Sequence, residues 1–307
     1  MSQAEFEVPA AAQRGFVTVG NFDGVHLGHQ HMLAVLQRIA EENAAPAVVV
    51  TFDPHPLTLL KPDSLLPRLT TIAHRCELLG KYGADEIVIL PVTLELLRLT
   101  PDLFFDRILC HRLKAAGVVE GPNFSFGRDR AGDVGLLADL CRVVGIAFRV
   151  IEPVEVAGEL ISSSRIRDSL GDGQVREAVG MIGHAHRISG TVARGAGRGR
   201  DIGYPTANLE NVKVMVPGHG VYAGTARLGG ERYVVAVSIG PNPTFGDDTV
   251  KIECHLDKFD GDLYGRTLEI DLLSEIRSLQ PFDSAEELKR QIAADVQQCR
   301  EQVARHD

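Results

Sequence analysis

The sequence lacks the features of a secreted, membrane-bound or nucleic-acid-binding protein. Its five cysteines are scattered and contain no C-x-x-C pair, which is typical of a reduced cytosolic protein. No apolar run is long enough to span a bilayer, and the first residues show no charged segment followed by an apolar stretch. The formal net charge of -9 argues against a nucleic-acid partner, although it is compatible with a local basic pocket for a small anion. We therefore expect a cytoplasmic protein with neither nucleic-acid nor membrane partners.

What is present predicts two domains with different folds. At 307 residues, with 44% apolar and 24% charged residues, the chain is long enough for two globular cores. Between residues 16 and 150, strand-like runs alternate with helical patterns, which predicts an α/β fold whose parallel sheet is covered by helices on both faces. Later strand-like runs are separated by Gly, Asn, Pro and Asp, which predicts a small antiparallel β-barrel. We expect the domains to comprise residues 1–183 and 184–307.

The element boundaries follow from the same patterns. In the first domain we expect strands at residues 16–19, 47–52, 86–91, 118–120 and 147–151, and helices at 71–82, 101–115 and 134–144. A short helix at 174–182 precedes barrel strands at 187–194, 220–228, 232–239, 250–259 and 267–273. A terminal helix starts at Ser284, where S-A-E-E forms a capping box.

The most informative stretch is residues 16–29, F-V-T-V-G-N-F-D-G-V-H-L-G-H. An apolar strand is followed by a glycine turn and by a helix with an apolar stripe at Met32, Leu36, Ile39 and Ala40. Free backbone N–H groups and the helix dipole favour an anion at such a helix start. The predicted nucleotide-binding positions here are Gly20, Asn21, Phe22, Asp23, Gly24 and Gly28.

Two histidines, His26 and His29, lie three residues apart on one face of this helix start. Imidazole N–H groups can donate to phosphate oxygens that gain charge in a transition state, while Gly28 leaves room beside them. A zinc half-site or a surface pair is the alternative, and the preceding strand and N-F-D-G turn favour the phosphate site. The stretch resembles the H-x-G-H nucleotidyltransferase superfamily, which transfers AMP from ATP to a phosphate acceptor.

Further motifs follow later strands, where ligands of parallel sheets bind. In residues 52–56, F-D-P-H-P, two prolines hold His55 near the sheet edge, but the motif taken alone favours an ordinary proline turn. Residues 120–133 form a glycine-rich loop in which Phe124 and Phe126 could clamp a planar ring and Asn123 could bond its edge. A flexible surface loop is the alternative, but two phenylalanines would be unusual in water.

Residues 161–168, I-S-S-S-R-I-R-D, combine hydroxyls with positive charge. Ser162 and Ser163 can cap a helix and also bind a phosphate oxygen. Arg165 and Arg167 can neutralise a triphosphate. A simple capped helix would explain the serines but not both arginines, which favours a phosphate site.

The barrel half begins with a glycine- and arginine-rich loop, G-A-G-R-G-R-D-I-G-Y-P-T-A-N at residues 195–208. Its backbone N–H groups can close over phosphates, and Thr206 and Asn208 offer oxygen donors that Mg²⁺ accepts. No Walker A pattern is present, and an RNA-binding segment is disfavoured by the folded surroundings and the acidic chain. The predicted nucleotide-binding positions are Gly197, Gly199, Gly203 and Pro205.

A carboxylate occurs later, in I-E-C-H-L-D at residues 252–257. Alternation along a strand places Glu253 and His255 on one face and the apolar residues on the other. If that face points into the barrel mouth, Glu253 can act as general base for a substrate hydroxyl. A solvent-facing glutamate is the alternative.

Together these motifs resemble the bacterial family of bifunctional riboflavin kinases/FAD synthetases, from about residue 16 to residue 295. The motifs in the family's order are N-F-D-G-V-H-L-G-H, F-D-P-H-P, N-F-S-F-G, I-S-S-S-R-I-R, G-Y-P-T-A-N, N-P-T-F-G and F-D-G-D-L-Y-G. The resemblance implies a Rossmann-like N-terminal nucleotidyltransferase domain and a C-terminal β-barrel flavokinase domain. It further implies ATP and Mg²⁺ as co-substrate and cofactor, riboflavin as substrate, and FMN and FAD as products.

The resemblance also implies roles for single residues. His26 and His29 match histidines that stabilise the α-phosphate, and Asn123 matches a position that holds flavin or nucleotide. The second phosphate motif corresponds to Ser162, Ser163, Arg165 and Arg167. Thr206 and Asn208 match the Mg²⁺ and ATP motif, and Glu253 matches the kinase general base. The chain departs from the family in having Ser164 for a threonine, and residues 277–282 lack the glutamate of R-x-E-x-x-F.

Two other functions are compatible with parts of the pattern. Another H-x-G-H adenylyltransferase, acting on phosphopantetheine or a nicotinate nucleotide, would lack the G-Y-P-T-A-N and I-E-C-H-L pair. A flavin-binding regulator without activity would not need His26, His29 and Glu253. The motifs leave the oligomeric state open.

Overall fold

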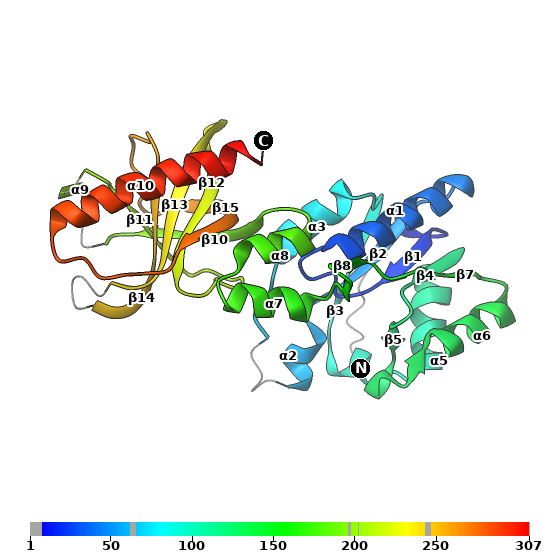
Figure 1. Cartoon of the computed structure of the whole chain (residues 1–307). Coiled ribbons are helices and arrows are strands. Elements are labelled where there is room, and N and C mark those ends of the chain that lie inside the picture. The colour runs from blue at the N-terminus through cyan, green and yellow to red at the C-terminus, as the bar shows by residue number, and fades with distance from the viewer. Residues whose placement is uncertain (1–7, 62–65, 196–197, 202, 243–246, 307) are drawn as a thin grey trace. The chain divides into compact units, whose positions relative to one another are not determined.

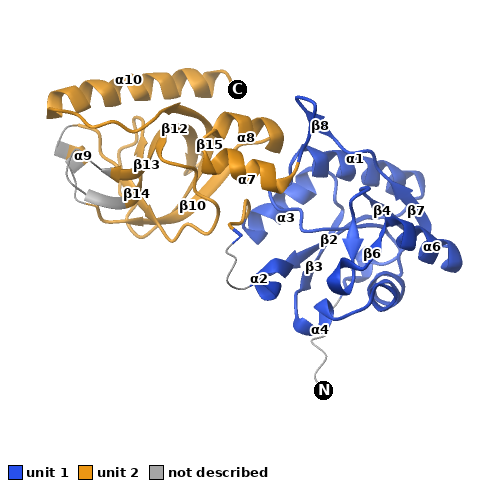
Figure 2. Ribbon diagram, turned by 60° about the horizontal axis from the view of Figure 1, so that its bottom comes forward, with its two compact units in different colours: residues 1–66, 71–161 blue, residues 67–70, 162–307 orange. Residues whose placement is uncertain are grey.

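The structure is a computed structural model that describes residues 8–61, 66–195, 198–201, 203–242 and 247–306 (Figure 1). The chain forms two compact units (Figure 2). The first comprises Met1–Leu66 and Thr71–Ile161, and the second Pro67–Thr70 and Ser162–Asp307. The expected domain boundary after residue 183 stays a prediction. No helix in the described ranges is long and apolar enough to cross a membrane.

The described residues of the first unit build a five-stranded parallel sheet, as predicted. The spatial order is β3 (Glu86–Pro91), β2 (Ala47–Asp53), β1 (Phe16–Val19), β4 (Gly117–Glu120) and β7 (Ala147–Val150). The middle strand β1 is buried along its whole length, as expected for a strand with helices on both sides of the sheet. Its carboxyl end therefore opens at the centre of the sheet edge.

Helices cover both faces of this sheet (Figure 1). One face packs against α1 (Leu27–Glu42) and α3 (Ile72–Lys81). The other packs against α5 (Pro101–Phe104), the π-helix η2 (Phe105–Arg112) and α6 (Val134–Val144). The helix predicted at 101–115 therefore starts as expected but continues as a π-helix. In α1 the buried side chains are Leu33, Leu36 and Ala40. The buried face of the helix is therefore turned slightly from the predicted apolar stripe.

Short elements connect these layers in the first unit. They are η1 (Ala10–Ala12), α2 (Pro56–Leu60), α4 (Leu94–Leu97), β5 (Ser125–Phe126), η3 (Arg128–Arg130), β6 (Gly132–Asp133), β8 (Glu155–Val156) and β9 (Glu159–Leu160). β5 pairs with β6, and β8 with β9, both antiparallel.

The second unit contains two helices, α7 (Ser163–Gly171) and α8 (Val175–Ile182), followed by a closed antiparallel barrel. The barrel order in the described chain is β10 (His186–Ala193), β11 (Ala207–Glu210), β14 (Asp247–Leu256), β13 (Glu231–Asn242), β12 (Gly220–Leu228) and β15 (Thr267–Arg277). The predicted barrel is thus confirmed, and β11 is a strand that the sequence pattern did not reveal. The short helix α9 (Arg198–Asp201) lies between β10 and β11.

The terminal helix α10 (Ala285–Ala304) packs against β12, β13 and β15. Its predicted start is confirmed, because the Ser284 hydroxyl accepts a hydrogen bond from the Glu287 N–H at 3.2 Å. The Glu287 carboxylate accepts in turn from the Asp283 N–H at 3.2 Å. Arg277 at the end of β15 forms a bidentate ion pair with the buried Asp295 of α10, with a shortest N–O distance of 2.8 Å. These bonds hold the helix against the barrel.

Candidate active sites

The first candidate site is the turn that leaves β1. The Gly20 N–H donates to the Val50 carbonyl at 3.0 Å, and the Thr51 hydroxyl donates to the Asn21 carbonyl at 3.1 Å. Phe22 has a φ of 49° and Val25 a φ of 37°. Positive φ is rare for an aromatic or β-branched residue, so this turn stores backbone strain. Strain of this kind is found where a site requires a fixed backbone.

The two histidines lie together at the start of α1. His26 is the residue before the helix and is buried, and its ring stacks on that of His29 with centroids 3.6 Å apart. Phe22 contacts the His29 ring edge-on at 5.1 Å. A β-carbon at position 28 would lie 3.2 Å from the His26 ring, so Gly28 keeps that space clear. The structure thus brings the two predicted histidines and Gly28 into one cluster.

The buried atoms His29 Nδ1 and Asn21 Oδ1 of this cluster have no hydrogen-bond partner within the described part of the chain. An unsatisfied buried polar atom costs about 1–3 kcal/mol, which is tolerated at sites where a ligand supplies the partner. Burial lowers the pKa of His29 well below 6.5, and the charges of His26 and Arg75 lower it further. His29 is therefore a neutral imidazole at neutral pH.

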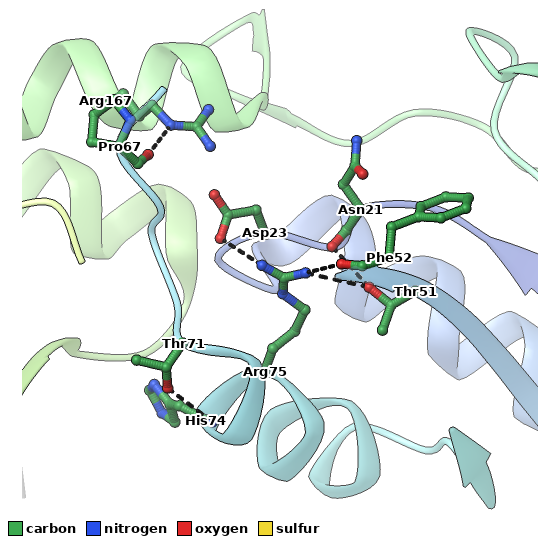
Figure 3. A network of polar contacts seen from close by, with 9 residues as sticks. All are labelled: Asn21, Asp23, Thr51, Phe52, Pro67, Thr71, His74, Arg75 and Arg167. Atoms are coloured by element: carbon green, nitrogen blue, oxygen red, sulfur yellow. Dashed lines mark hydrogen bonds and ion pairs between the residues drawn. The ribbon is translucent and has the colours of Figure 1, made fainter. Parts of the chain in front are cut away.

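Arg75 is a residue of this site that the sequence analysis missed (Figure 3). It comes from the first turns of α3, and its side chain is 4% exposed. One guanidinium nitrogen lies 3.3 Å from the Asp23 carboxylate, and another donates to the Thr51 hydroxyl and the Phe52 carbonyl, each at 3.4 Å. Asp23, predicted to bind the nucleotide, is 3% exposed and directs one carboxylate oxygen to Arg75.

Glu120 is a second missed residue, at the end of β4. Its carboxylate accepts a hydrogen bond from the Val19 N–H at 2.7 Å and is almost completely buried. Burial raises the pKa of Glu120 well above 4.5, and the bond from Val19 offsets only part of this rise. A carboxyl group therefore lies at the ends of β1 and β4, next to the strained turn.

The loop after β4 carries the two phenylalanines of the expected aromatic clamp. Phe126 is 5% exposed, belongs to the core of the first unit, and lies 5.6 Å from the Phe124 ring in a stacked arrangement. In the structure this ring anchors the loop, and its predicted contact with a ligand stays a prediction. Asn123 is exposed at the tip of the loop. His55 caps the short helix α2 through its Nδ1, which accepts from the Leu57 N–H at 3.1 Å.

The serine- and arginine-rich motif forms the start of α7 in the second unit. The Ser162 hydroxyl accepts from the Arg165 N–H at 3.2 Å, which confirms the predicted helix cap, and Ser163 is the first helical residue. The Arg165 guanidinium lies 3.6 Å from the Glu177 carboxylate. Arg167 is buried, and its Nε donates to the Pro67 carbonyl at 2.7 Å (Figure 3). The predicted phosphate contacts of these arginines stay predictions.

The second candidate site lies on the barrel, where strand register brings three polar residues together. Asn208 of β11 is directly opposite Glu253 of β14, and Glu253 is directly opposite Ser238 of β13. Directly paired residues project to the same face of a sheet. All three are half-buried, while Ile252 and Cys254 on the opposite face are buried. The predicted alternation is confirmed, and it aligns Asn208 with Glu253.

The glycine-rich segment packs closely on this row. A β-carbon at Gly195 would overlap the Asn208 side-chain amide, and one at Gly199 would lie 3.3 Å from the Thr206 hydroxyl. Gly203 has a φ of 87°, which a residue with a side chain rarely adopts. Only glycine therefore fits where the segment approaches the proposed Mg²⁺ donors. Gly197 lies outside the described residues.

The G-Y-P-T motif contacts a histidine of β14. His255 donates a ring hydrogen bond from Nδ1 to the Pro205 carbonyl at 2.9 Å, and its ring packs edge-on against Tyr204 at 5.2 Å. Asp257, the residue directly after this strand, forms a bidentate pair with Arg300 of α10 at 2.8 and 2.9 Å. The Arg300 hydrogen bonds are the largest cause that lowers the pKa of Asp257.

Thr206 and Asn208 suit a hard cation that also binds phosphate. Among the described residues, no group of three or more His, Cys, Asp or Glu side chains could hold a metal ion. Mg²⁺, however, commonly takes one or two protein oxygens and completes its coordination with water and substrate phosphates. A hydroxyl and an amide under a close-packed glycine backbone fit that mode of binding.

Comparison with known proteins matches two families to successive parts of the chain. A family model described as FAD synthetase matches residues 8–165, and one described as riboflavin kinase matches residues 182–303. A bifunctional riboflavin kinase/FMN adenylyltransferase of Pseudomonas fluorescens is 36% identical over 289 residues, covering 94% of this chain and 93% of the relative. The Escherichia coli K12 protein of the same description is 36% identical over 293 residues, covering 95% and 94%.

One solved structure has a similar fold over nearly the whole chain. It is a crystal structure described as a macrolide-efflux protein from Streptococcus pneumoniae, with a TM-score of 0.84 and 32% identity. The likeness covers 93% of this chain and 94% of that one. Both units are therefore found together in another solved chain.

Proposed function

The chain belongs to the family of bifunctional riboflavin kinases/FMN adenylyltransferases, and from this premise we propose how its residues carry out the two reactions. The protein is a transferase that phosphorylates riboflavin with ATP to give FMN. It then adenylylates FMN with a second ATP to give FAD. Riboflavin, FMN and ATP are its substrates.

We place the kinase reaction on the row formed by Asn208 and Glu253. Glu253 removes the proton of the ribityl 5′-hydroxyl, whose oxygen attacks the γ-phosphate of ATP, and ADP leaves. The backbone of the glycine-rich segment would hold the phosphates, and the side chains of Thr206 and Asn208 would hold a magnesium ion. When bound, Mg²⁺ would neutralise charge on the phosphoryl oxygens, which is the main requirement of phosphoryl transfer.

We place adenylyl transfer on the turn that follows β1. A phosphate oxygen of FMN attacks the α-phosphate of ATP, and pyrophosphate leaves. The acceptor is already a good nucleophile, so no covalent enzyme intermediate is required. His26 and His29 donate N–H groups to the α-phosphate oxygens as charge develops there.

The observation that carries this proposal is the assembly of two chemically different clusters, one in each unit. The stacked pair His26 and His29 lies in the first unit, and the aligned pair Asn208 and Glu253 lies in the second. Each cluster suits one of the two reactions and not the other. We also propose a cytoplasmic location, which the five free cysteine thiols support.

Incubation of the full chain with riboflavin, ATP and Mg²⁺, followed by chromatography, tests the proposal. We expect FMN and then FAD, and with FMN supplied we expect FAD and pyrophosphate in equal amounts. A phosphopantetheine or nicotinate adenylyltransferase would make neither flavin product. A non-catalytic flavin-binding protein would retain flavin without consuming ATP.

A further inference from the structure

We propose that Arg75 is a positioning residue of the adenylyl-transfer site, which fixes the turn carrying His26 and His29 from behind. The inference rests on the function proposed above and concerns a residue that none of the sequence motifs includes. Arg75 is not expected to touch the substrate, because its side chain is 4% exposed and faces protein oxygens.

The guanidinium connects the ends of two neighbouring strands (Figure 3). It bonds Asp23 in the turn after β1, and it donates to Thr51 and Phe52 at the end of β2. The Thr51 hydroxyl itself donates to the Asn21 carbonyl at 3.1 Å. Arg75 therefore reaches the turn directly at Asp23 and indirectly at Asn21, on both sides of the strained Phe22.

The shape of the guanidinium suits this task. Arginine offers several N–H donors in a rigid planar fork, whereas lysine is a point charge on a flexible stem. Here the fork spans a carboxylate, a hydroxyl and a backbone carbonyl that come from two strand ends. A turn with positive φ at Phe22 and Val25 persists only where its surroundings fix it. The three contacts of Arg75 are part of that fixation.

Arg75 also acts on the histidines through its charge. The titratable and charged groups recorded around this turn in the described residues include Asp23, His26, His29, Arg75 on α3 and Glu120 at the end of β4. After burial and His26, the charge of Arg75 is the third cause that lowers the pKa of His29. Arg75 thereby helps to keep His29 neutral before substrates bind.

The test uses the full chain with Arg75→Met, Arg75→Lys and the matched control Arg142→Met. Arg142 forms an exposed pair with Asp139 at 2.6 Å on α6 of the same unit. For each variant, kcat and KM are measured for FAD formation from FMN, and kcat for FMN formation from riboflavin in the same preparation. The titration of His29 is followed by NMR, and folding by circular dichroism.

We expect Arg75→Met to lower kcat for FAD formation about a hundredfold, as small misplacements at reacting centres do, while FMN formation stays within about twofold. We expect Arg75→Lys to lose less, because the charge remains, and Arg142→Met to match the wild type. The pKa of His29 should rise in Arg75→Met, which a purely structural role would not produce in a folded protein.

Asp23→Asn provides a second variant if Arg75→Met does not fold, since an amide keeps the volume and removes the ion pair. Equal FAD formation in Arg75→Met and Arg142→Met would overturn the proposal. An unchanged His29 titration in Arg75→Met would refute the effect of the Arg75 charge on His29. A wild-type protein that makes no FAD would instead refute the proposed function itself.

Discussion

The two units of this chain build their proposed sites in different ways. In the first unit the polar groups are buried and crowded into one strained turn, where His26 and His29 stack and Asp23 and Arg75 pair. In the second unit the polar groups are half-buried and spread along neighbouring strands, where the register alone aligns Asn208 with Glu253. The difference corresponds to the chemistry that we propose, in which the first site stabilises charge and the second must also remove a proton.

The comparison also indicates where each site is sensitive. A site built on desolvated charges depends on partners behind it, such as Arg75 and Glu120. A site built on strand register depends on the close approach of a neighbouring backbone segment to its side chains, as at Gly195 and Gly199. Substitutions in the two units should therefore affect the two reactions separately.

Replacement of the proposed base should produce the largest loss. We expect Glu253→Gln to lower FMN formation from riboflavin about a hundredfold to ten-thousandfold, the usual contribution of a general base. FAD formation from supplied FMN should be unchanged. The control Glu269→Gln alters a glutamate on β15 whose carboxylate lies 3.5 Å from Arg187 on the barrel surface. Equal FMN formation in the two variants would refute the role of Glu253.

Replacement of one histidine should reverse this pattern. We expect His29→Ala to lower FAD formation about a hundredfold or more, because one donor to the developing charge is lost. FMN formation from riboflavin should continue. His31→Ala is the control, since His31 is exposed on the same helix. If His29→Ala abolished both reactions, the separation of the two sites would be wrong.

A single methyl group above Asn208 should have a moderate effect. Gly195→Ala places a β-carbon on the Asn208 amide, so the amide must move and FMN formation should fall about tenfold, with a higher Mg²⁺ requirement. Gly180→Ala in α8 is the control, because nothing lies within 4 Å of its β-carbon position. A Gly195→Ala variant with wild-type Mg²⁺ dependence would refute the proposed role of Asn208 in holding Mg²⁺.

The smallest effect is on stability and concerns the first unit alone. The pKa of folded Glu120 lies above the unfolded value of 4.5, so its stabilising contribution is complete below 4.5 and is lost as the pH rises toward the folded pKa. Glu120→Gln keeps an acceptor for Val19 and has no proton to lose. We therefore expect Glu120→Gln to melt at a higher temperature than the wild type at pH 8 and at the same temperature at pH 4.5. Each kcal/mol gained in the free energy of unfolding should raise the melting temperature by about 2–4 °C.

Glu41→Gln, at an exposed position of α1, serves as the comparison for this measurement. A lower melting temperature of Glu120→Gln at pH 8 would show that Glu120 is ionised in the folded protein. The same rise in melting temperature at pH 4.5 and pH 8 would show that the titration of Glu120 is not its cause.

Much of the fold could be predicted because its signals are local. Alternating strand and helix patterns predict the parallel sheet, and glycine turns between short strands predict the barrel. The histidine pair was found because H-x-G-H directly follows a strand and a turn. β11 was missed because four residues after Pro205 are too few to show a period.

The supporting residues could not be predicted because their roles depend on tertiary packing. Arg75 occurs in an ordinary amphipathic helix, and its only signal is that it shares the buried face with Leu78 and Leu79. Glu120 ends a strand that is buried on both faces, where a carboxylate is out of place. An ionisable residue on a predicted buried face thus indicates a residue that supports a site.

The most direct test of the central claim is a mixture of His29→Ala and Glu253→Gln proteins supplied with riboflavin, ATP and Mg²⁺. If each reaction has its own site, Glu253→Gln should adenylylate the FMN that His29→Ala releases, and FAD should form although neither protein makes it alone. A His29→Ala protein that makes no FMN from riboflavin, or a Glu253→Gln protein that makes no FAD from supplied FMN, would contradict two separable sites.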